Sequence, residues 1–349
     1  MKQANFSPQK MFYQIAETHE PLLSFSGKSA SDFEEWKTTA RPKIKETLGI
    51  FPDRVDPNPE LIAEWRHDGL IKQRWRINLH EFLSTTVLIN IPENAQEHAP
   101  LPAIFCWHGH GPFGKEVVMG NDSSPEMREN IDRHNYAYGH VMAKAGFVTF
   151  AIDWLGNGDM AEGGKPNWNV QNGQRDWCNL YYVHATMLGM TSISINVAFG
   201  MMATDFVCGL PEVDGARLGV MGLSGGGTMT TWTSFCDKRF RAAEIICYSG
   251  YWPVFGFRDI NYCGMQVAPG LFRLAHLHDI QGSLAPMPLL VDIGAYDTCF
   301  KIDESMHCYR GVEKIYGAAG VADKLHLDLF PGEHGWGGNR SVEFFQAYL

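Results

Sequence analysis

From about residue 100 to its end, the chain repeats short, nearly continuous apolar runs separated by segments of helical character. The runs read LPAIFCW, GFVTFAIDW, RLGVMGL, AAEIICYSG, PLLVDIGA and LHLDLF. Strands that are apolar without alternation are typical of a sheet whose two faces are both covered by helices. The succession of strand, helix and strand therefore predicts an α/β fold with a doubly wound, mostly parallel sheet.

Helices are expected between these strands and at the end of the chain, over 134–145, 181–209, 225–236, 303–316 and 341–349. Before them, LIKQRWRINL and STTVLINIP alternate apolar and polar residues, which predicts a half-exposed antiparallel pair. No linker interrupts the chain, so 61–349 is interpreted as one catalytic domain.

Residues 1–60 are mixed in composition and mainly helical in character. Ser31-Asp-Phe-Glu34 has the Ser-x-x-Glu form of a capping box, which predicts the start of a helix there. We interpret this segment as an N-terminal helical extension that packs over the main domain.

Charge and cysteine content narrow the class of protein. The formal net charge is −10 and Lys and Arg form no block, which argues against nucleic acid or an anionic membrane as the main partner. The start MKQANFSPQK carries no apolar signal segment, so a cytoplasmic location is the expectation. The eight cysteines are scattered without a CxxC pair and are expected to be reduced thiols.

One serine is surrounded by glycines directly after an apolar run. Gly222-Leu-Ser224-Gly-Gly226 matches G-x-S-x-G, with RLGVM before it and the helical GGTMTTWTSF after it. In a nucleophile elbow a strained strand-to-helix turn lifts the serine hydroxyl above the sheet. Only small residues fit two positions before and two positions after the serine, because larger side chains would collide with the tight turn. The pattern predicts that Ser224 is a nucleophile. A phosphate-binding loop is disfavoured, because neither Lys-[Ser/Thr] nor G-x-G-x-x-G spacing is present.

A serine hydroxyl needs a base within hydrogen-bond reach, and that base needs an orienting group. His334 is chosen because FPGEHGWGG follows a predicted strand and is rich in glycine. The other histidines considered are less suitable because of their positions. His184 precedes Ser224, and His276 and His278 precede the strand that should carry the acid. His307 lies on a predicted helix, and His326 lies inside a predicted strand.

The acid is expected at the end of the strand PLLVDIGA. Asp297 lies just beyond that strand, on the edge where ligands gather, whereas Asp292 lies within it and would point into a sheet face. Asp303 is the second choice, but its position is typical of a helix N-terminus. Asp297 is therefore predicted to orient His334.

Attack on an ester carbonyl produces an oxyanion that needs preorganised N–H donors. One predicted donor is the backbone N–H of Gly225. The other comes from the loop WHGHGPFG, with His110 preferred and Gly109 as the alternative. His108 and His110 stand at i, i+2 without a nearby third ligand, so no metal is predicted.

The ordered motifs HGHG, IDWLGNGD, LPEVDGARLGVMGLSGGG, APMPLLVDIGAYD and FPGEHGW resemble the α/β-hydrolase superfamily, over about 100–349. They are most similar to its dienelactone-hydrolase and acetyl xylan esterase-like branch, which is related to prolyl oligopeptidase catalytic domains. The resemblance implies a catalytic triad of Ser224, Asp297 and His334, with the oxyanion-hole loop at 108–110. It also implies that 261–271 covers or lines the acyl pocket. It also places His108, Asp153, Trp154 and Trp336 near the substrate.

Together these features predict a serine esterase that forms an acyl-enzyme, without cofactor or metal, on a small ester such as an acetylated sugar. The carbohydrate part rests on family analogy, since a fold does not fix a function. Three alternatives stay open: a serine peptidase, a lactone or C–C hydrolase on the same triad, and a non-catalytic binding protein of the same fold.

Overall fold

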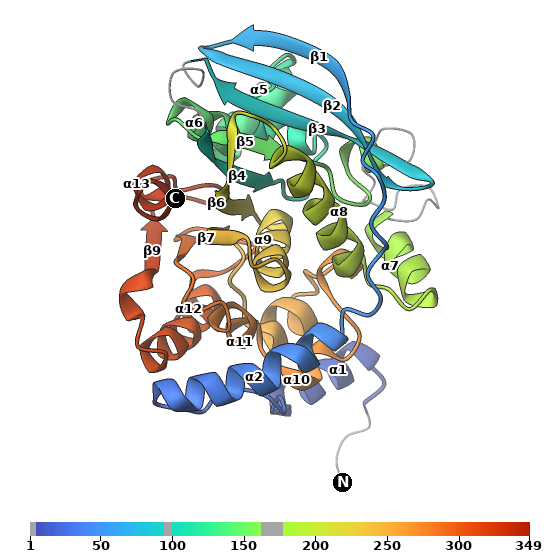
Figure 1. The fold of residues 1–349 in the computed structure, drawn as a ribbon. Coiled ribbons are helices and arrows are strands. Elements are labelled where there is room, and N and C mark those ends of the chain that lie inside the picture. Colours follow the sequence, from blue (N-terminus) through green and yellow to red (C-terminus); the bar gives the residue numbers. More distant parts are fainter. Residues whose placement is uncertain (1–4, 94–99, 162–176) are drawn as a thin grey trace.

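The computed structural model describes residues 5–93, 100–161 and 177–349. Its strands form one nine-stranded sheet in the order β1-β2-β3-β5-β4-β6-β7-β8-β9 (Figure 1). The bounds of the strands are β1 Glu60–His67, β2 Leu70–His80, β3 Leu83–Pro92, β4 Leu101–Trp107, β5 Val148–Ala151, β6 Val213–Leu223, β7 Phe240–Ile246, β8 Leu289–Gly294 and β9 Leu325–Phe330.

The helices surround this sheet. Their bounds are α1 Pro8–Thr18, α2 Ala30–Glu46, α4 Lys115–Val118, α5 Pro125–His134, α6 Tyr138–Lys144, α7 Trp177–Met187, α8 Ser192–Val207, α9 Gly225–Cys236, α10 Leu271–Leu274, α11 Leu277–Gly282, α12 Ile302–Ala318 and α13 Ser341–Tyr348. Short 3₁₀ turns lie at Gly158–Met160, Gly264–Gln266 and Ala322–Lys324, and a π-helical turn lies at Pro253–Arg258.

The sheet combines two kinds of pairing. From β5 through β4, β6, β7 and β8 to β9 every neighbouring pair is parallel, while β1, β2, β3 and β5 pair antiparallel. The mostly parallel, doubly wound α/β sheet predicted from the apolar runs is therefore confirmed. The antiparallel pair is confirmed as β2 and β3, whereas β1 was not anticipated, because all eight of its residues are exposed and it carries no core-facing pattern.

Two separate hydrophobic clusters cover the two faces of the sheet. Along β4, Phe105 and Trp107 pack into one cluster with residues of α8, α9 and α12, while Ile104 and Cys106 pack into the other with residues of α6 and α13. Successive side chains of a strand point to opposite faces, so each run of apolar residues fills both clusters. This is the physical reason why the strand sequences show no alternation.

Helix boundaries differ from the sequence prediction at three places. The segment 134–145 is divided between α5 and α6, and 181–209 between α7 and α8. The third difference is the capping box of α2. Its N-cap is Ser29, which accepts from Asp32 N–H while the Asp32 carboxylate accepts from Ser29 N–H. The predicted capping box at Ser31 and Glu34 is thus wrong by two residues. In the observed box the third helical residue, which accepts the hydrogen bond from the N-cap N–H, is an aspartate and not a glutamate.

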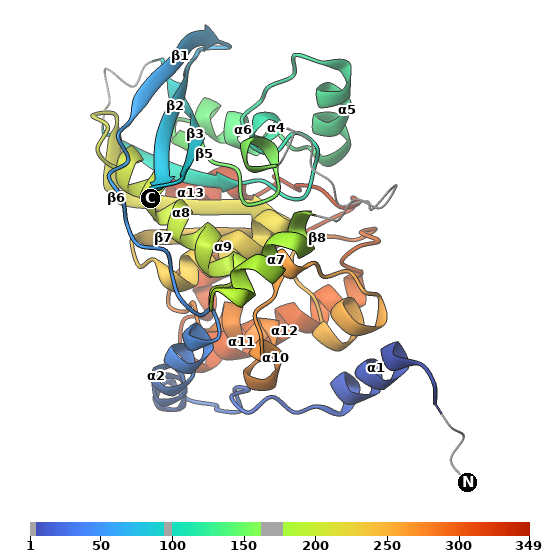
Figure 2. The same ribbon diagram turned by 90° about the vertical axis from the view of Figure 1, so that its right-hand side faces the viewer.

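The N-terminal helices lie along the edge formed by α10, α11 and α12, as Figures 1 and 2 both show. Arg41 of α2 donates to Ser283 O (2.8 Å) and packs its guanidinium 4.1 Å from the Phe235 ring centroid. The division into an extension over 1–60 and a domain over 61–349 stays a prediction.

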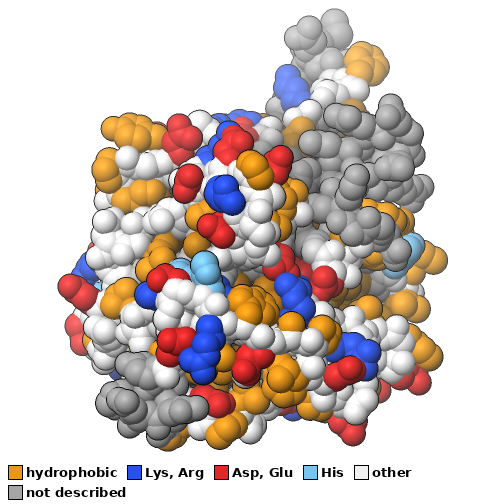
Figure 3. Space-filling view, turned by 90° about the horizontal axis from the view of Figure 1, so that it is seen from above, with side chains coloured by type: hydrophobic (Ala, Val, Ile, Leu, Met, Phe, Trp, Pro, Cys, Tyr) orange, Lys and Arg blue, Asp and Glu red, His pale blue; other side chains and the backbone are white. Residues whose placement is uncertain are grey.

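Acidic and basic side chains are interspersed on the face seen in Figure 3.

Candidate active site

Ser224 occupies the sharp turn between β6 and α9. Its φ of 60° lies in the left-handed region, which a non-glycine residue rarely adopts. A Cβ on Gly226 would lie 2.3 Å from Trp107 O, and a Cβ on Gly222 would lie 2.6 Å from Gly226 O. The glycines at these two positions are therefore required by the close approach of neighbouring backbone, as the elbow pattern predicts.

Asp297 and His334 lie on the loops that follow β8 and β9. His334 Nδ1 is 2.7 Å from Asp297 Oδ2, and the backbone N–H groups of Cys299 and Phe300 donate to Asp297 Oδ1 at 2.7 and 2.9 Å. Burial alone would raise the pKa of Asp297, but the hydrogen bond and charge of His334 hold that pKa below its usual value. An ionised carboxylate only accepts, so Nδ1 carries the hydrogen and Nε2 is left as the basic nitrogen.

The loop that carries His334 is held from both sides. His134, the last residue of α5, donates from Nδ1 to His334 O (2.6 Å), and its own carbonyl accepts from Trp336 N–H (2.9 Å). The Phe300 ring stacks on the imidazole of His334 at 5.9 Å between centroids and 13° between planes. These contacts fix the ring in the orientation that its bond to Asp297 requires.

Ser224, His334 and His110 line one cavity of about 560 Å³ at the carboxyl ends of the parallel strands. Its other described lining residues are Cys178, Asn179, Phe255, Ile260, Asn261, Tyr262, Cys263, Gln266, Cys299 and Phe300. Residues 261, 262, 263 and 266 belong to the predicted pocket segment 261–271. The rejected acids lie elsewhere: Asp292 is fully buried within β8, and Asp303 lies in the first turn of α12.

The loop after β4 lies directly beside the elbow. A Cβ on Gly109 would lie 3.3 Å from Ser224 Cβ, and a Cβ on Gly225 would lie 3.0 Å from His110 Nδ1. Gly109 N–H donates to Tyr136 Oη at 2.6 Å, so this amide is already engaged away from the cavity. The engaged amide of Gly109 is therefore disfavoured as the loop donor, and the role of His110 stays a prediction.

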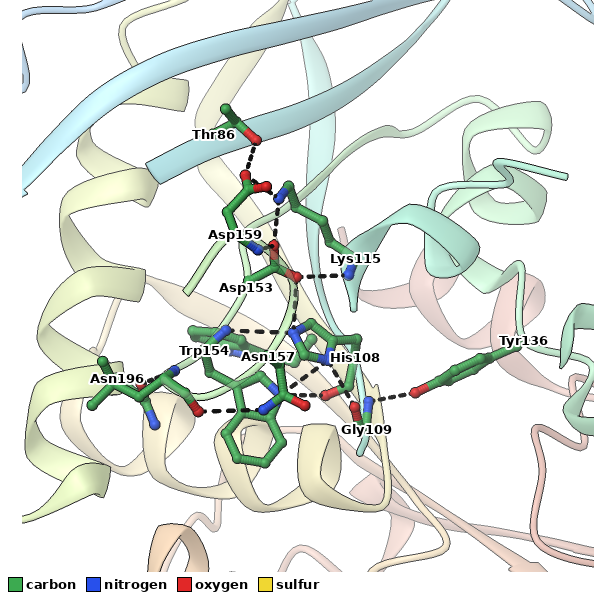
Figure 4. Close-up of polar contacts among 12 residues, drawn as sticks. Thr86, His108, Gly109, Lys115, Tyr136, Asp153, Trp154, Asn157, Asp159 and Asn196 are labelled. Carbon is green, nitrogen blue, oxygen red and sulfur yellow. Dashed lines mark hydrogen bonds and ion pairs between the residues drawn. The ribbon is translucent and has the colours of Figure 1, made fainter. Parts of the chain in front are cut away.

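A buried ionic cluster holds this loop in place (Figure 4). Asp153 Oδ1 lies 3.2 Å from His108 Nε2 and accepts from Lys115 N–H at 2.8 Å, while Asp153 Oδ2 pairs with Lys115 Nζ. Lys115 Nζ also donates to Asp159 Oδ2 at 2.8 Å. Trp154 Nε1 lies 3.1 Å from His108 Nδ1 and donates to His108 O at 3.0 Å. Through His108 the cluster orders the backbone that leads to His110.

The charges in this cluster stabilise one another. Burial alone would raise the pKa of Asp153, but the charge of Lys115 and the hydrogen bond from His108 hold it below its usual value. Burial alone would lower the pKa of Lys115, but the charges of Asp153 and Asp159 raise it. A Cβ on Gly114 or on Gly158 would lie 2.2 Å from the Asp153 carboxyl group, so glycine at both positions lets the chain wrap around that group.

The four residues expected to contact substrate lie behind the lining of the cavity. His108, Asp153, Trp154 and Trp336 are all buried and none lines the cavity. Trp336 donates from Nε1 to Glu244 Oε1 (2.9 Å) beneath the loop. Their contact with substrate stays a prediction, and in the structure these side chains support the loops that carry His110 and His334. Lys115 and Tyr136 were missed, since nothing in the sequence marks a buried lysine or a tyrosine that holds a backbone amide.

Two clusters of metal-ligating side chains occur among the described residues, each with its donor atoms within 4.8 Å of one another. One joins His110, Cys178 and Cys263, and the other joins Cys247 to the Asp297 and His334 pair. The pKa of the Cys263 thiol lies well below its usual value because of a hydrogen bond with Cys178 and the proximity of His110. Burial keeps the pKa of the Cys247 thiol well above its usual value.

Residues 2–207 match the model of the Abhydrolase family. The chain belongs to the Abhydrolase family. The matched segment includes the loop after β4 but ends before the elbow, so family membership by itself says nothing of Ser224. Among curated proteins, the chain is 21% identical over 291 residues to "Putative hydrolase YtaP" of Bacillus subtilis (strain 168), covering 81% of this chain and 89% of the relative.

Solved structures share the fold of this Abhydrolase-family chain. A protein from Bacteroides fragilis NCTC 9343, described as a "putative acetyl xylan esterase", superposes with a TM-score of 0.74 at 19% identity, covering 94% of this chain and 83% of its own. A glucuronoyl esterase from Solibacter usitatus superposes with a TM-score of 0.63 at 16% identity, covering 90% and 93%. The predicted resemblance to the acetyl xylan esterase-like branch of α/β hydrolases is confirmed at the level of the fold.

Within the described residues, every helix is too short or too polar to span a bilayer.

Proposed function

We propose that this Abhydrolase-family protein is a serine-dependent carboxylic ester hydrolase. The observation that carries the proposal is the 2.7 Å contact between His334 Nδ1 and Asp297 Oδ2, with His334 and Ser224 facing one cavity. In the proposed reaction Ser224 Oγ attacks the ester carbonyl while His334 Nε2 takes its proton and then returns it to the leaving alcohol. Asp297 stabilises the imidazolium ion formed between these two steps.

The oxyanion of the tetrahedral intermediate is proposed to accept hydrogen bonds from the backbone N–H groups of Gly225 and His110. Gly225 is the first residue of α9, and an amide at that position has no acceptor within its own helix. The N-terminal end of the helix dipole also favours negative charge there. Water then attacks the acyl-Ser224 ester, with His334 as the base, and releases the acid.

The substrate class that we propose is an acylated carbohydrate. The cavity is lined by the partly exposed ring of Tyr262 and the exposed amide side chain of Asn261. Aromatic faces stack on the apolar faces of sugars, while amides hydrogen-bond to hydroxyl groups. Two proteins of the same fold, one described as a "putative acetyl xylan esterase" and the other a glucuronoyl esterase, support this class.

Ser224→Ala tests the proposal. We expect hydrolysis of p-nitrophenyl acetate to fall by about 10⁴-fold or more, because the acyl-enzyme cannot form. A fluorophosphonate should label the parent protein and the matched control Ser123→Ala, whose serine lies on a loop outside the cavity, but not Ser224→Ala. Unchanged labelling of Ser224→Ala would place the reactive nucleophile at another residue, and a parent protein that does not react at all would favour a non-catalytic binding protein.

A substrate panel separates the alternatives that use the same triad. Acetylated xylose derivatives, simple lactones and peptide anilides are compared by kcat/KM. Acetylated sugars are expected to give the highest value. A preference for anilides or for lactones would replace the esterase proposal with a peptidase or a lactonase.

A further inference from the structure

A cluster of soft ligand atoms lies in the wall of the candidate active site. His110 Nε2 is 3.2 Å from Cys263 Sγ, and Cys178 Sγ lies within 4.8 Å of both atoms. All three residues line the same cavity as Ser224. They come from three separate segments: the loop after β4, the first turn of α7, and the turn before Gly264–Gln266.

The spacing of these atoms suits one tetrahedral ion. With Zn–S distances of about 2.3 Å and Zn–N distances of about 2.0 Å, neighbouring ligand atoms in a tetrahedral site lie about 3.5 Å apart. His110 Nε2 and Cys263 Sγ are 3.2 Å apart and Cys178 Sγ lies within 4.8 Å of both, so shifts of about an ångström would bring the three atoms to that spacing. Two thiolates and one imidazole favour Zn²⁺ and disfavour Mg²⁺ and Ca²⁺, which prefer oxygen ligands.

All three residues line the cavity, so an ion bound by them would lie in the cavity wall. His110 Nδ1 lies beside Gly225 while Nε2 faces Cys263, so an ion on Nε2 would occupy cavity space next to the elbow. That space is where we place the ester. A bound ion and a bound substrate would therefore compete.

We propose that His110, Cys178 and Cys263 bind one Zn²⁺ ion in the wall of the cavity, and that bound zinc inhibits ester hydrolysis at Ser224. The binding site stands on its own geometry. Only the inhibition rests on the proposed function.

Binding is tested on the full chain, freed of metal and kept reduced with a phosphine. Co²⁺ is titrated in first, because a tetrahedral cobalt–thiolate site gives charge-transfer and intense d–d absorption bands. We expect one equivalent of Co²⁺ to produce these bands and one equivalent of Zn²⁺ to remove them. Cys178→Ser and Cys263→Ser should each weaken Zn²⁺ binding by at least tenfold, because each loses one thiolate ligand.

Two matched variants serve as controls. Cys299→Ser removes a cysteine that lines the same cavity outside the trio, and Cys247→Ser removes the thiol of the other cluster. Both should bind Co²⁺ and Zn²⁺ as the parent protein does. Parent-like binding by Cys178→Ser and Cys263→Ser, or loss of the bands in Cys247→Ser, would overturn the assignment.

Inhibition is measured as the rate with zinc relative to each protein's own metal-free rate. Zinc should slow the parent protein and Cys299→Ser, EDTA should restore both, and Cys263→Ser should resist. Equal inhibition of Cys263→Ser, or acceleration of the parent by zinc, would overturn the inhibitory role. If the metal-free parent hydrolyses no ester, the proposed function fails, and the cobalt spectrum still decides the metal site.

Discussion

Asp297 Oδ2 and His334 Nδ1 lie 2.7 Å apart although 37 positions of sequence separate them. The whole of α12 and β9 intervenes, and the parallel pairing of β8 with β9 brings the loops after both strands to the same edge of the sheet. The contact is made by topology rather than by neighbouring sequence.

The first prediction concerns this contact. Asp297→Asn should lower kcat for p-nitrophenyl acetate by about 10⁴-fold, because an amide no longer fixes the imidazole tautomer with Nε2 as the base. Asp303→Asn, in the first turn of α12, is the matched control and should keep nearly full activity. Steady-state kinetics at one pH check both variants. The reverse pattern would transfer the acid role to Asp303.

The second prediction concerns the elbow. Gly226→Ala places a methyl group 2.3 Å from Trp107 O, so the turn must open and Ser224 must move. We expect activity to fall at least a hundredfold and the melting temperature to drop. Gly317→Ala, at an exposed position of α12 with no atom within 4 Å of the added Cβ, should leave activity intact and raise stability by up to about 1 kcal/mol. A fully active Gly226→Ala protein would contradict this account of the turn.

The third prediction concerns the buried ionic cluster. Lys115→Met leaves the Asp153 carboxylate buried without its cation, which should reduce the free energy of unfolding by about 3 to 5 kcal/mol. The esterase rate should also fall, because the loop that carries His110 loses its support. Lys144→Met removes an exposed partner of Asp68 and should change little. Urea denaturation compares the two variants, and similar losses in both would refute the role of the cluster.

The fourth prediction concerns pH. Burial raises the pKa of Glu244 to about 7, although Ser341 and Trp336 donate to its carboxylate at 2.6 and 2.9 Å. The folded state therefore holds a proton that the unfolded chain has lost between about pH 4.5 and 7, so stability should fall as the pH rises through that window. The expected loss is on the order of 1 to 3 kcal/mol.

Glu244→Gln keeps an oxygen to accept both hydrogen bonds and removes the titration. Its free energy of unfolding, measured in urea at pH 5, 6, 7 and 8, should fall less steeply than that of the parent. Burial also raises the pKa of Asp292, so some slope should persist. Glu343→Gln, exposed on α13, is the control and should follow the parent curve. A parent-like slope in Glu244→Gln would exclude Glu244 as the source.

The sequence by itself determined the features that depend on local pattern and chain order. Continuous apolar runs predicted a covered parallel sheet, because each strand must fill both hydrophobic clusters. The glycines around Ser224 predicted its strained turn, since only residues without a Cβ fit there. The order of Ser224, Asp297 and His334 followed from the order of the strands that carry them.

Only the tertiary structure decided which side chains meet. It buried His108 and Asp153 around Lys115, engaged Gly109 N–H with Tyr136, and added two distant cysteines to His110. These contacts join residues tens to more than a hundred positions apart, and no periodicity or spacing encodes them. They form because crossing helices and loops close over one edge of the sheet, where burial makes each polar group find a partner.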